Sequence, residues 1–451
     1  MIRRAINNNT LEIIVILISF VNVFFGIIPV LPLVLGMVAI SLLRLDLISA
    51  FIFSCFITSP VLGFSSYYLG IGSYGVIIEL ILFLICLFHW KFTKSIEFSG
   101  YKNGITLLLF VFLLLTISAF INSGGDYYIR KLLETFKNGI LYFFAFGFLF
   151  SNVKKVDFVR LGLTFILFSI LILLLSSLLN NGSGPGSFLD FGYMRNQNIE
   201  IEVKDKDALL VSYHYVGLFA LMGCSFIVFE SNYRKISNLF MLFCFGISIL
   251  VSLYAGARQF IVISVVMMLL WFFSQKGKGV SGRLLFVAGA CASVLFVYSL
   301  FAEGGMLNSV KEEGYLEASN RGAILIKAVN DFTEHPLFGV GYGHFEFYGE
   351  YGGYPHNLFV ELLCELGVFG LSVLLIIIVW PLKHMLRYQK SCIYLLVVFF
   401  FKAMVSSGFD YNIMLFSYIF AVLCLERNST LLYGVSSPTY RGEIDKAIPI
   451  R

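Results

Sequence analysis

Residues 357–380 read NLFVELLCELGVFGLSVLLIIIVW and are long and apolar enough to cross a lipid bilayer as one helix. This run follows a polar stretch, Glu303 to Pro355, which interrupts an otherwise apolar chain. The 357–380 segment contains two carboxylates, Glu361 and Glu365, which are four residues apart and therefore share one face of the helix. Because acidic side chains are costly inside a membrane, this pair indicates a functional site.

The composition of the whole chain is typical of a membrane protein. Of its 451 residues, 59% are hydrophobic and 13% charged, and the mean hydropathy is +0.88. A soluble domain is about half apolar and about a quarter charged. The eight cysteines all lie in apolar runs, so no disulfide framework or zinc-type spacing is present. We therefore predict an all-α polytopic membrane protein with a single integral membrane domain.

Apolar runs of helical length predict about 12 to 14 transmembrane helices. The first run follows Met1-Ile-Arg-Arg without a small-residue cleavage site, so we interpret it as a membrane helix rather than a signal peptide. The predicted spans lie near residues 11–28, 30–43, 47–63, 71–90, 104–122, 132–151, 159–179, 208–229, 236–254, 258–274, 283–302, 357–380, 392–407 and 411–425. The second and the last two are short, and the first two could form one re-entrant pair.

Lysines and arginines gather in alternate loops of this topology, which predicts a cytoplasmic N-terminus and a cytoplasmic C-terminus. Two large loops then face outward, at about 180–207 and 303–355. The predicted organisation is a first transmembrane part at 1–302, the large outer loop at 303–355, a second transmembrane part at 356–426 and a cytoplasmic tail at 427–451.

The larger outer loop contains a predicted amphipathic helix that lies over the membrane domain. Ser319 or Asn320 can provide its N-cap, Arg321 falls in its first turn, and Pro336 ends it. Apolar residues at helical spacing form the predicted stripe, which consists of Ile324, Leu325, Ala328, Val329 and Phe332.

Two arginines and one histidine near the outer face are the candidate catalytic residues. Arg258 follows Ala255-Gly256-Ala257 at the start of a span, where small residues let a ligand approach closely. An arginine at this depth is costly unless it is paired or binds an anion, although an interfacial snorkelling arginine is the structural alternative. Arg321 is either a solvated loop residue or a guanidinium that binds phosphate oxygens through two hydrogen bonds. His356 begins a span and can accept a proton from a hydroxyl.

Four further positions are candidate substrate-binding residues, namely Asn357, Glu361, His214 and Arg195. The two carboxylates of the 357–380 helix could orient His356 or bind sugar hydroxyls. The alternative interpretation is a buried structural pair held by Lys402 or by tyrosines. His214 could equally be a packed polar residue of its span.

Two other groups of residues have preferred structural interpretations. An internal ion network is the preferred interpretation of the charged face formed by Arg130, Lys131, Glu134 and Lys137. Gly339, Gly341 and Gly343 could offer backbone amides to phosphate, but a turn is preferred. The chain has no Gly-x-x-x-x-Gly-Lys-Ser/Thr motif and no His-Glu-x-x-His motif, so an ATP-driven pump and that type of zinc site are not indicated. We predict no metal site, no cofactor and no nucleic-acid partner.

The segment from Arg321 to Leu371 carries the most specific pattern, which includes Glu334-His-Pro-Leu-Phe-Gly-Val-Gly-Tyr-Gly and His356-Asn-Leu-Phe-Val-Glu-Leu-Leu-Cys-Glu-Leu-Gly. With the Ala-Gly-Ala-Arg258 element, it resembles the O-antigen ligase and polymerase superfamily of bacterial envelope glycosyltransferases. The resemblance implies a GT-C-like, metal-independent, inverting glycosyltransferase of the bacterial inner membrane, with its site and the 303–355 loop facing the periplasm. The donor would be a glycan on undecaprenyl pyrophosphate. Arg258 and Arg321 would bind the pyrophosphate, and His356 would position or deprotonate the acceptor hydroxyl.

The resemblance leaves several functions to be distinguished. The predicted number of spans favours a polymerase that joins undecaprenyl-pyrophosphate-linked repeat units of O-antigen or capsule, because the ligase relatives typically have fewer helices. A paired-arginine repeat of some polymerases is absent from both outer loops, so an O-antigen ligase that transfers glycan to lipid A core stays an alternative. A lipid-linked oligosaccharide flippase is the second alternative. Besides the lipid-linked donor, the acceptor and the bilayer, a chain-length regulator is a candidate partner.

Overall fold

This computed structural model describes residues 98–122, 127–151, 157–179, 213–231, 235–274, 321–345, 355 and 357–388, with shorter pieces at 394, 396–398, 400, 403 and 415–421. Regular structure in these residues is helical. The helices are α6 (Phe98–Asn122), α7 (Tyr127–Ser151), α8 (Phe158–Leu179), α10 (Tyr213–Ser231), α11 (Asn238–Ala255), α12 (Arg258–Ser274), α15 (Arg321–Glu334) and α17 (Leu358–Tyr388).

The helices confirm the prediction of an all-α polytopic membrane protein. Each of α6, α7, α8, α10, α11, α12 and α17 matches a predicted span, although α6 begins earlier and α17 ends later than predicted. Three stretches among the described residues are long and apolar enough to cross a membrane, namely Gly104–Ile121, Asn238–Ala255 and Leu358–Val379. The predicted spans at 11–28, 30–43, 47–63, 71–90 and 283–302 lie outside the described residues, so the total number stays a prediction.

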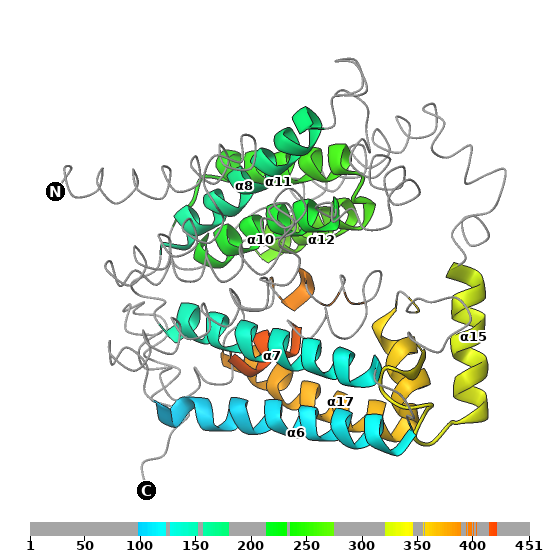
Figure 1. The fold of residues 1–451 in the computed structure, drawn as a ribbon. Helices are drawn as coiled ribbons and strands as arrows, with labels where there is room; N and C mark the ends of the chain where they lie inside the picture. The colour runs from blue at the N-terminus through cyan, green and yellow to red at the C-terminus, as the bar shows by residue number, and fades with distance from the viewer. Residues whose placement is uncertain are drawn as a thin grey trace, which may run out of the picture.

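Helices α8, α10, α11 and α12 pack together as one group, here called the α8–α12 layer (Figure 1). Its tightest contact lies between α8 and α10, where a Cβ atom on Gly162 or on Gly223 would collide with the backbone oxygen of the other glycine. The ring of Phe165 contacts the rings of Phe219 and Phe226, each at a centroid distance of 5.6 Å. This layer is therefore held by close backbone approach and aromatic packing.

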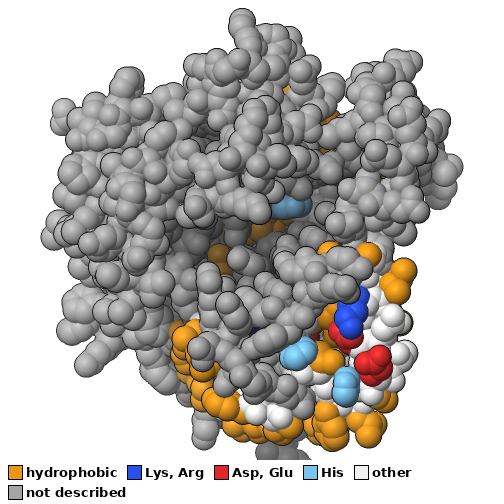
Figure 2. Space-filling model, turned by 45° about the vertical axis from the view of Figure 1, so that its right-hand side comes forward, with side chains coloured by type: hydrophobic (Ala, Val, Ile, Leu, Met, Phe, Trp, Pro, Cys, Tyr) orange, Lys and Arg blue, Asp and Glu red, His pale blue; other side chains and the backbone are white. Residues whose placement is uncertain are grey.

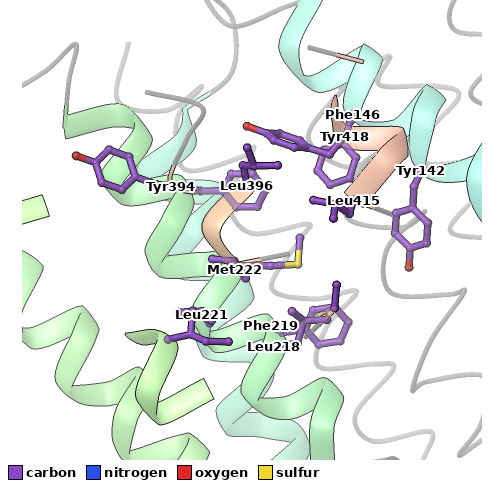
Figure 3. Close-up of a cluster of buried hydrophobic side chains, with 14 of the residues drawn as sticks. Tyr142, Phe146, Leu218, Phe219, Leu221, Met222, Tyr394, Leu396, Leu415 and Tyr418 are labelled. Atoms are coloured by element: carbon purple, nitrogen blue, oxygen red, sulfur yellow. The ribbon is translucent and has the colours of Figure 1, made fainter. Parts of the chain in front are cut away.

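Helices α6, α7 and α17, with α15 at the edge, form a second group, here called the α6–α17 layer (Figure 1). Apolar side chains of both layers join one continuous buried core. In Figure 3, Leu218 and Met222 of α10 lie toward Leu396 and Leu415, which belong to the later part of the chain. The core positions the two layers against each other and leaves the helix ends to carry the polar groups.

Several neighbouring helices run in opposite directions, so several chain positions gather at one end of the bundle. Helices α6 and α7, and likewise α11 and α12, are antiparallel neighbours (Figure 1). Ring contacts of Phe158 with Phe229 and of Phe168 with Phe219 show that α8 and α10 are antiparallel. The ends that lie together, here called the Arg258 end, are those at Asn122, Tyr127, Leu179, Tyr213, Ala255, Arg258 and Leu358 (Figure 1).

Helix α15 confirms the predicted amphipathic helix of the outer loop, because it begins at Arg321 and ends at Glu334, just before Pro336. The predicted apolar stripe is wrong in part. Ile324 and Ala328 are buried, but Leu325 and Val329 are 36% and 46% exposed. Asp331, three residues after Ala328, is buried on the same face. Among the described helices, α15 packs mainly along α17, so its packed face there is narrower than the apolar pattern.

Candidate active site

A tight turn between α11 and α12 sets the position of Arg258. Gly256 adopts a left-handed conformation (φ 78°), and its N–H donates to the carbonyl of Leu253 at 3.0 Å. The N–H of Ala257 donates to the carbonyl of Ser252 at 2.9 Å, which completes the C-cap of α11. Helix α12 then starts at Arg258. The small residues before Arg258 are therefore required by a buried turn, and the backbone of Arg258 stands at a helix N-terminus.

His214, a predicted substrate-binding residue, lies beside this turn. Its Nδ1 atom is 3.0 Å from Nε2 of Gln259, the residue that follows Arg258. Helix α10 approaches closely here, because a Cβ atom on Gly217 would collide with Phe260 and Ala257. The structure thus brings His214 and the backbone of Arg258 together at the Arg258 end.

Helix α15 and the first turns of α17 run side by side in the same direction (Figure 1). The chain that leaves α15 pairs with the middle of α17, since the N–H of Val368 donates to the carbonyl of Pro336 at 2.9 Å. Earlier in the chain than Pro336 and Val368, Ile324 and Ala328 of α15 share a small buried cluster with Cys364 of α17. Because both helices run toward the same pairing, their N-termini lie at the same end.

Asn357 is the N-cap of α17. Its Oδ1 atom accepts hydrogen bonds from the N–H groups of Phe359 at 3.0 Å and Val360 at 3.2 Å. The parallel packing therefore places Arg321, the first residue of α15, and Asn357 at corresponding ends of neighbouring helices. His356 and Arg195 lie outside the described residues, and of Arg258 and Arg321 only the backbone is described.

Helix α17 is interrupted at Gly367, whose φ of 66° and ψ of −171° are not helical. The loop after α15 fills this break. The N–H groups of Val340 and Gly341 donate to the carbonyls of Cys364 and Glu365, both at 2.9 Å, and the N–H of Phe369 donates to the carbonyl of Leu337 at 3.2 Å. Backbone groups that the break leaves open thus find partners in the loop.

The three glycines of this loop support the preferred interpretation of a turn. Gly339, Gly341 and Gly343 all have positive φ, at 70°, 103° and 86°. At Gly339, a Cβ atom would also collide with the backbone of α17 at residues 364–366. Their amides serve the fold, because Gly339 N–H donates to the carbonyl of His335 at 2.9 Å and Gly343 N–H donates to the carboxylate of Glu365.

A buried ion cluster lies directly beneath this loop. The Nζ atom of Lys131 is 2.8 Å from Oε1 of Glu361 and 3.0 Å from Oε1 of Glu365. None of the three side chains is more than 1% exposed. The cation also lies 4.9 Å from the ring centre of Tyr342, within the range of a cation–π contact. Here the term ion cluster means Lys131, Glu361 and Glu365.

The ion cluster agrees with one of the interpretations that the sequence left open, a buried carboxylate pair held by a lysine. This lysine is Lys131 of α7. Lys402 lies outside the described residues. The predicted ion network around Lys131 therefore includes residues of another helix. Substrate binding by Glu361 stays a prediction.

Polar residues that the sequence did not single out complete this region. The hydroxyls of Tyr342 and Thr135 are 2.5 Å apart. The Oγ atom of Ser118 accepts from the N–H of Tyr342 at 3.2 Å. The sequence signal was that Lys131 stands just before the predicted span at 132–151 and that the two glutamates lie near the start of the span at 357–380.

The exposed face of α15 carries both charged and apolar side chains. Charged and histidine side chains gather there among apolar ones (Figure 2). They include Lys327, whose Nζ atom is 2.7 Å from Oδ1 of Asp331. Burial lowers the pKa of His344 below its usual value, although the charge of Asp331 acts in the opposite direction. Among the residues that the structure describes, no group of three or more His, Cys, Asp or Glu side chains could hold a metal ion.

Comparison with known proteins identifies the family of this region. No curated protein and no solved structure matches the chain. Residues 239–375, however, match the family model described as O-antigen ligase. The matched range extends from α11 into α17 and contains Arg258, Arg321 and His356. Residues 239–375 therefore form an O-antigen ligase family domain, which agrees with the resemblance to the O-antigen ligase and polymerase superfamily.

Proposed function

We propose that this protein polymerises undecaprenyl-pyrophosphate-linked oligosaccharide repeat units of an O-antigen or capsule. The observation that carries the proposal is the family match over residues 239–375, which includes all three predicted catalytic positions. The protein would act in the bacterial inner membrane with its site open to the periplasm. Its direct partners would be a lipid-linked donor, a lipid-linked acceptor and the bilayer, and a chain-length regulator could bind in addition.

The positions of the helix ends support an anion-binding role for the arginines. Arg258 is the first residue of α12 and Arg321 is the first residue of α15. A helix N-terminus carries partial positive charge, which adds to the charge of a guanidinium and favours a phosphate. We expect these groups to bind the pyrophosphate of the donor and to stabilise it most strongly as it gains charge.

The proposed reaction is a single displacement. The oxygen of an acceptor hydroxyl attacks the anomeric carbon, and the bond from that carbon to the phosphate oxygen breaks. His356 takes the hydroxyl proton, and undecaprenyl pyrophosphate leaves with the electron pair of the broken bond. Inversion at the anomeric carbon follows from this in-line attack. Arg258 and Arg321 supply fixed positive charge to the leaving group.

Product analysis with purified protein and a defined lipid-linked repeat unit tests this proposal. We expect Arg258→Ala, Arg321→Ala and His356→Ala each to slow chain growth about 100-fold or more, because each removes a group that acts on developing charge or on the proton. Lys327→Ala is the matched control for Arg321→Ala, since it removes a partly exposed cation from the same helix. Wild-type product ladders from all three alanine variants would contradict the proposed site.

An O-antigen ligase is the second candidate, and the description of the matched family favours it. A ligase would use the same donor but transfer the glycan to lipid A core. Both acceptors are therefore offered in one assay. Products on the lipid-linked repeat unit support the polymerase, whereas transfer to core lipid alone would replace it by the ligase. Lipid scrambling in proteoliposomes that is unchanged in His356→Ala, without any transfer, would indicate a flippase.

A further inference from the structure

The ion cluster joins chain segments that are far apart in sequence. Lys131 belongs to α7, and its two carboxylate partners lie one turn apart on α17. The ring of Tyr342 in the loop lies against the same cation, with its centre 4.9 Å from the Nζ atom. The loop is also bonded to the cluster directly, because Gly343 N–H donates to the carboxylate of Glu365. One lysine thus contacts both α17 and the loop that follows α15.

The two glutamates need a cation in order to lie where they do. Like charges one helical turn apart repel each other, and buried carboxylates are costly unless they are paired. Here the Nζ atom of Lys131 bonds both of them, at 2.8 Å to Glu361 and at 3.0 and 3.1 Å to the two oxygens of Glu365. Replacing Lys131 by an uncharged residue would leave two buried carboxylates side by side.

The ion cluster lies between two chain segments that lead to candidate catalytic positions, one to Arg321 and the other to His356. Glu361 is four residues after Asn357, the N-cap of α17, and its N–H donates to the carbonyl of that residue at 3.0 Å. The loop at Tyr342 is continuous with α15, which begins at Arg321. A movement of the loop or of the first turn of α17 against α7 would therefore move the start of α15 or the segment next to His356.

We propose that Lys131 is a positioning residue of the glycosyltransferase, because its charge fixes the 339–345 loop and the first turns of α17 against α7. The effect on catalysis rests on the proposed function. The fixing of the loop does not, so the two parts can be tested separately. Lys131 would touch neither the donor nor the acceptor, and it would act through the positions of Arg321 and His356.

Hydrogen exchange measured by mass spectrometry tests the fixing of the loop in the full-length protein in lipid nanodiscs. The N–H groups of Val340, Gly341 and Tyr342 are hydrogen-bonded to α17 and α6. In Lys131→Met we expect peptides that cover 339–345 to exchange about tenfold faster or more, while peptides of α10 to α12 keep their wild-type rates. Lys383→Met, which removes an exposed cation of α17, is the control and should leave both regions unchanged. Wild-type exchange at 339–345 in Lys131→Met would overturn the proposal.

Kinetics with the lipid-linked donor test the catalytic part. We expect Lys131→Met to lower kcat about 100-fold and to change KM less than about threefold, since misplaced groups fail in the transition state more than in binding. Lys131→Arg keeps the charge and should recover kcat to within about tenfold of wild type. If wild type transfers glycan to none of the offered acceptors but the exchange results hold, the proposed function fails and the role of Lys131 in the loop stands.

A variant without the three buried charges tests whether Lys131 positions the loop or only neutralises the two glutamates. Lys131→Met combined with Glu361→Gln and Glu365→Gln removes all three buried charges, so this variant should fold even where Lys131→Met alone does not. We expect its 339–345 peptides to exchange faster than wild type and its kcat to stay low. Recovery of both wild-type exchange and wild-type kcat in this variant would show that the ions only balance one another, and the proposal would be wrong.

Discussion

The two layers of this molecule are stabilised in different ways. In the α8–α12 layer, glycine contacts and aromatic rings hold α8 against α10, as at Gly162 and Gly223. In the α6–α17 layer, a break in α17 is filled by a loop, and a lysine is buried between two glutamates. Apolar packing tolerates many side chains of suitable size, whereas buried charges and backbone pairing tolerate few. The α6–α17 layer is therefore where we expect substitutions to be most disruptive.

The largest effect is expected at the loop in the α6–α17 layer. Gly339→Ala should lower the free energy of unfolding by about 3 kcal/mol or more, because the residue has positive φ and the new Cβ atom would meet the backbone of α17. Denaturant titration in detergent micelles measures the change. Gly246→Ala in α11 is the control, since no atom lies within 4 Å of its Cβ position. Equal effects of the two substitutions would remove the contrast between the layers.

A smaller loss is expected at the glycine contact of the α8–α12 layer. Gly162→Ala should cost about 2 kcal/mol, because the new methyl group would meet the carbonyl of Gly223 and the side chain of Ile227. The cost is lower than at Gly339 since φ is helical and two packed helices can separate slightly. The same titration measures it, and a loss larger than that of Gly339→Ala would reverse the expected order of the layers.

Removing the N-cap of α17 should have a still smaller effect on stability. Asn357→Ala should cost about 1 kcal/mol, because the N–H groups of Phe359 and Val360 lose their acceptor. Asn357→Asp keeps an acceptor oxygen and should keep most of the stability. If Asn357 also binds substrate, kcat/KM falls in both variants, whereas recovery of activity in Asn357→Asp would limit the residue to capping.

The smallest expected effect is a pH dependence at His344. Because burial lowers the pKa of His344, the unfolded chain binds a proton more readily than the folded protein. The stability that neutral His344 contributes is complete above its unfolded pKa of about 6.5 and is lost as the pH falls toward the lower folded value. His344→Gln should therefore reduce the fall in Tm between about pH 8 and about pH 5.5. The exposed His335→Gln serves as control, and an unchanged pH profile in His344→Gln would contradict this assignment.

Prediction from the sequence succeeded where a single physical signal decides the outcome. Apolar runs located the spanning helices, and Pro336 marked the end of α15. Prediction was less successful where a contact between two distant chain segments decides the structure. Hydropathy could not show that Lys131 is the partner of Glu361, because the pairing depends on which helix faces α17. Similarly, the apolar pattern predicted that Leu325 is packed, but Leu325 is 36% exposed, because α15 packs mainly along α17 among the described helices.

For the site itself, the structure shows that His214 lies beside Gln259, the residue after Arg258, and that Asn357 caps α17. That Arg258, Arg321 and His356 share one site stays a prediction. The roles of these residues stay predictions. The backbone pairing of residues 336–341 with α17 had no sequence signal beyond the glycines, because hydrogen bonds between main-chain groups do not depend on side-chain type.

The interruption of α17 at Gly367 limits how a sugar chain can reach this end of the protein. Four backbone hydrogen bonds join α17 to residues 336–341, through the N–H groups of Val340, Gly341, Val368 and Phe369. A buried peptide group that loses its partner when these bonds break is costly unless it finds another. We therefore expect residues 336–341 to stay paired with α17 while substrate enters and product leaves.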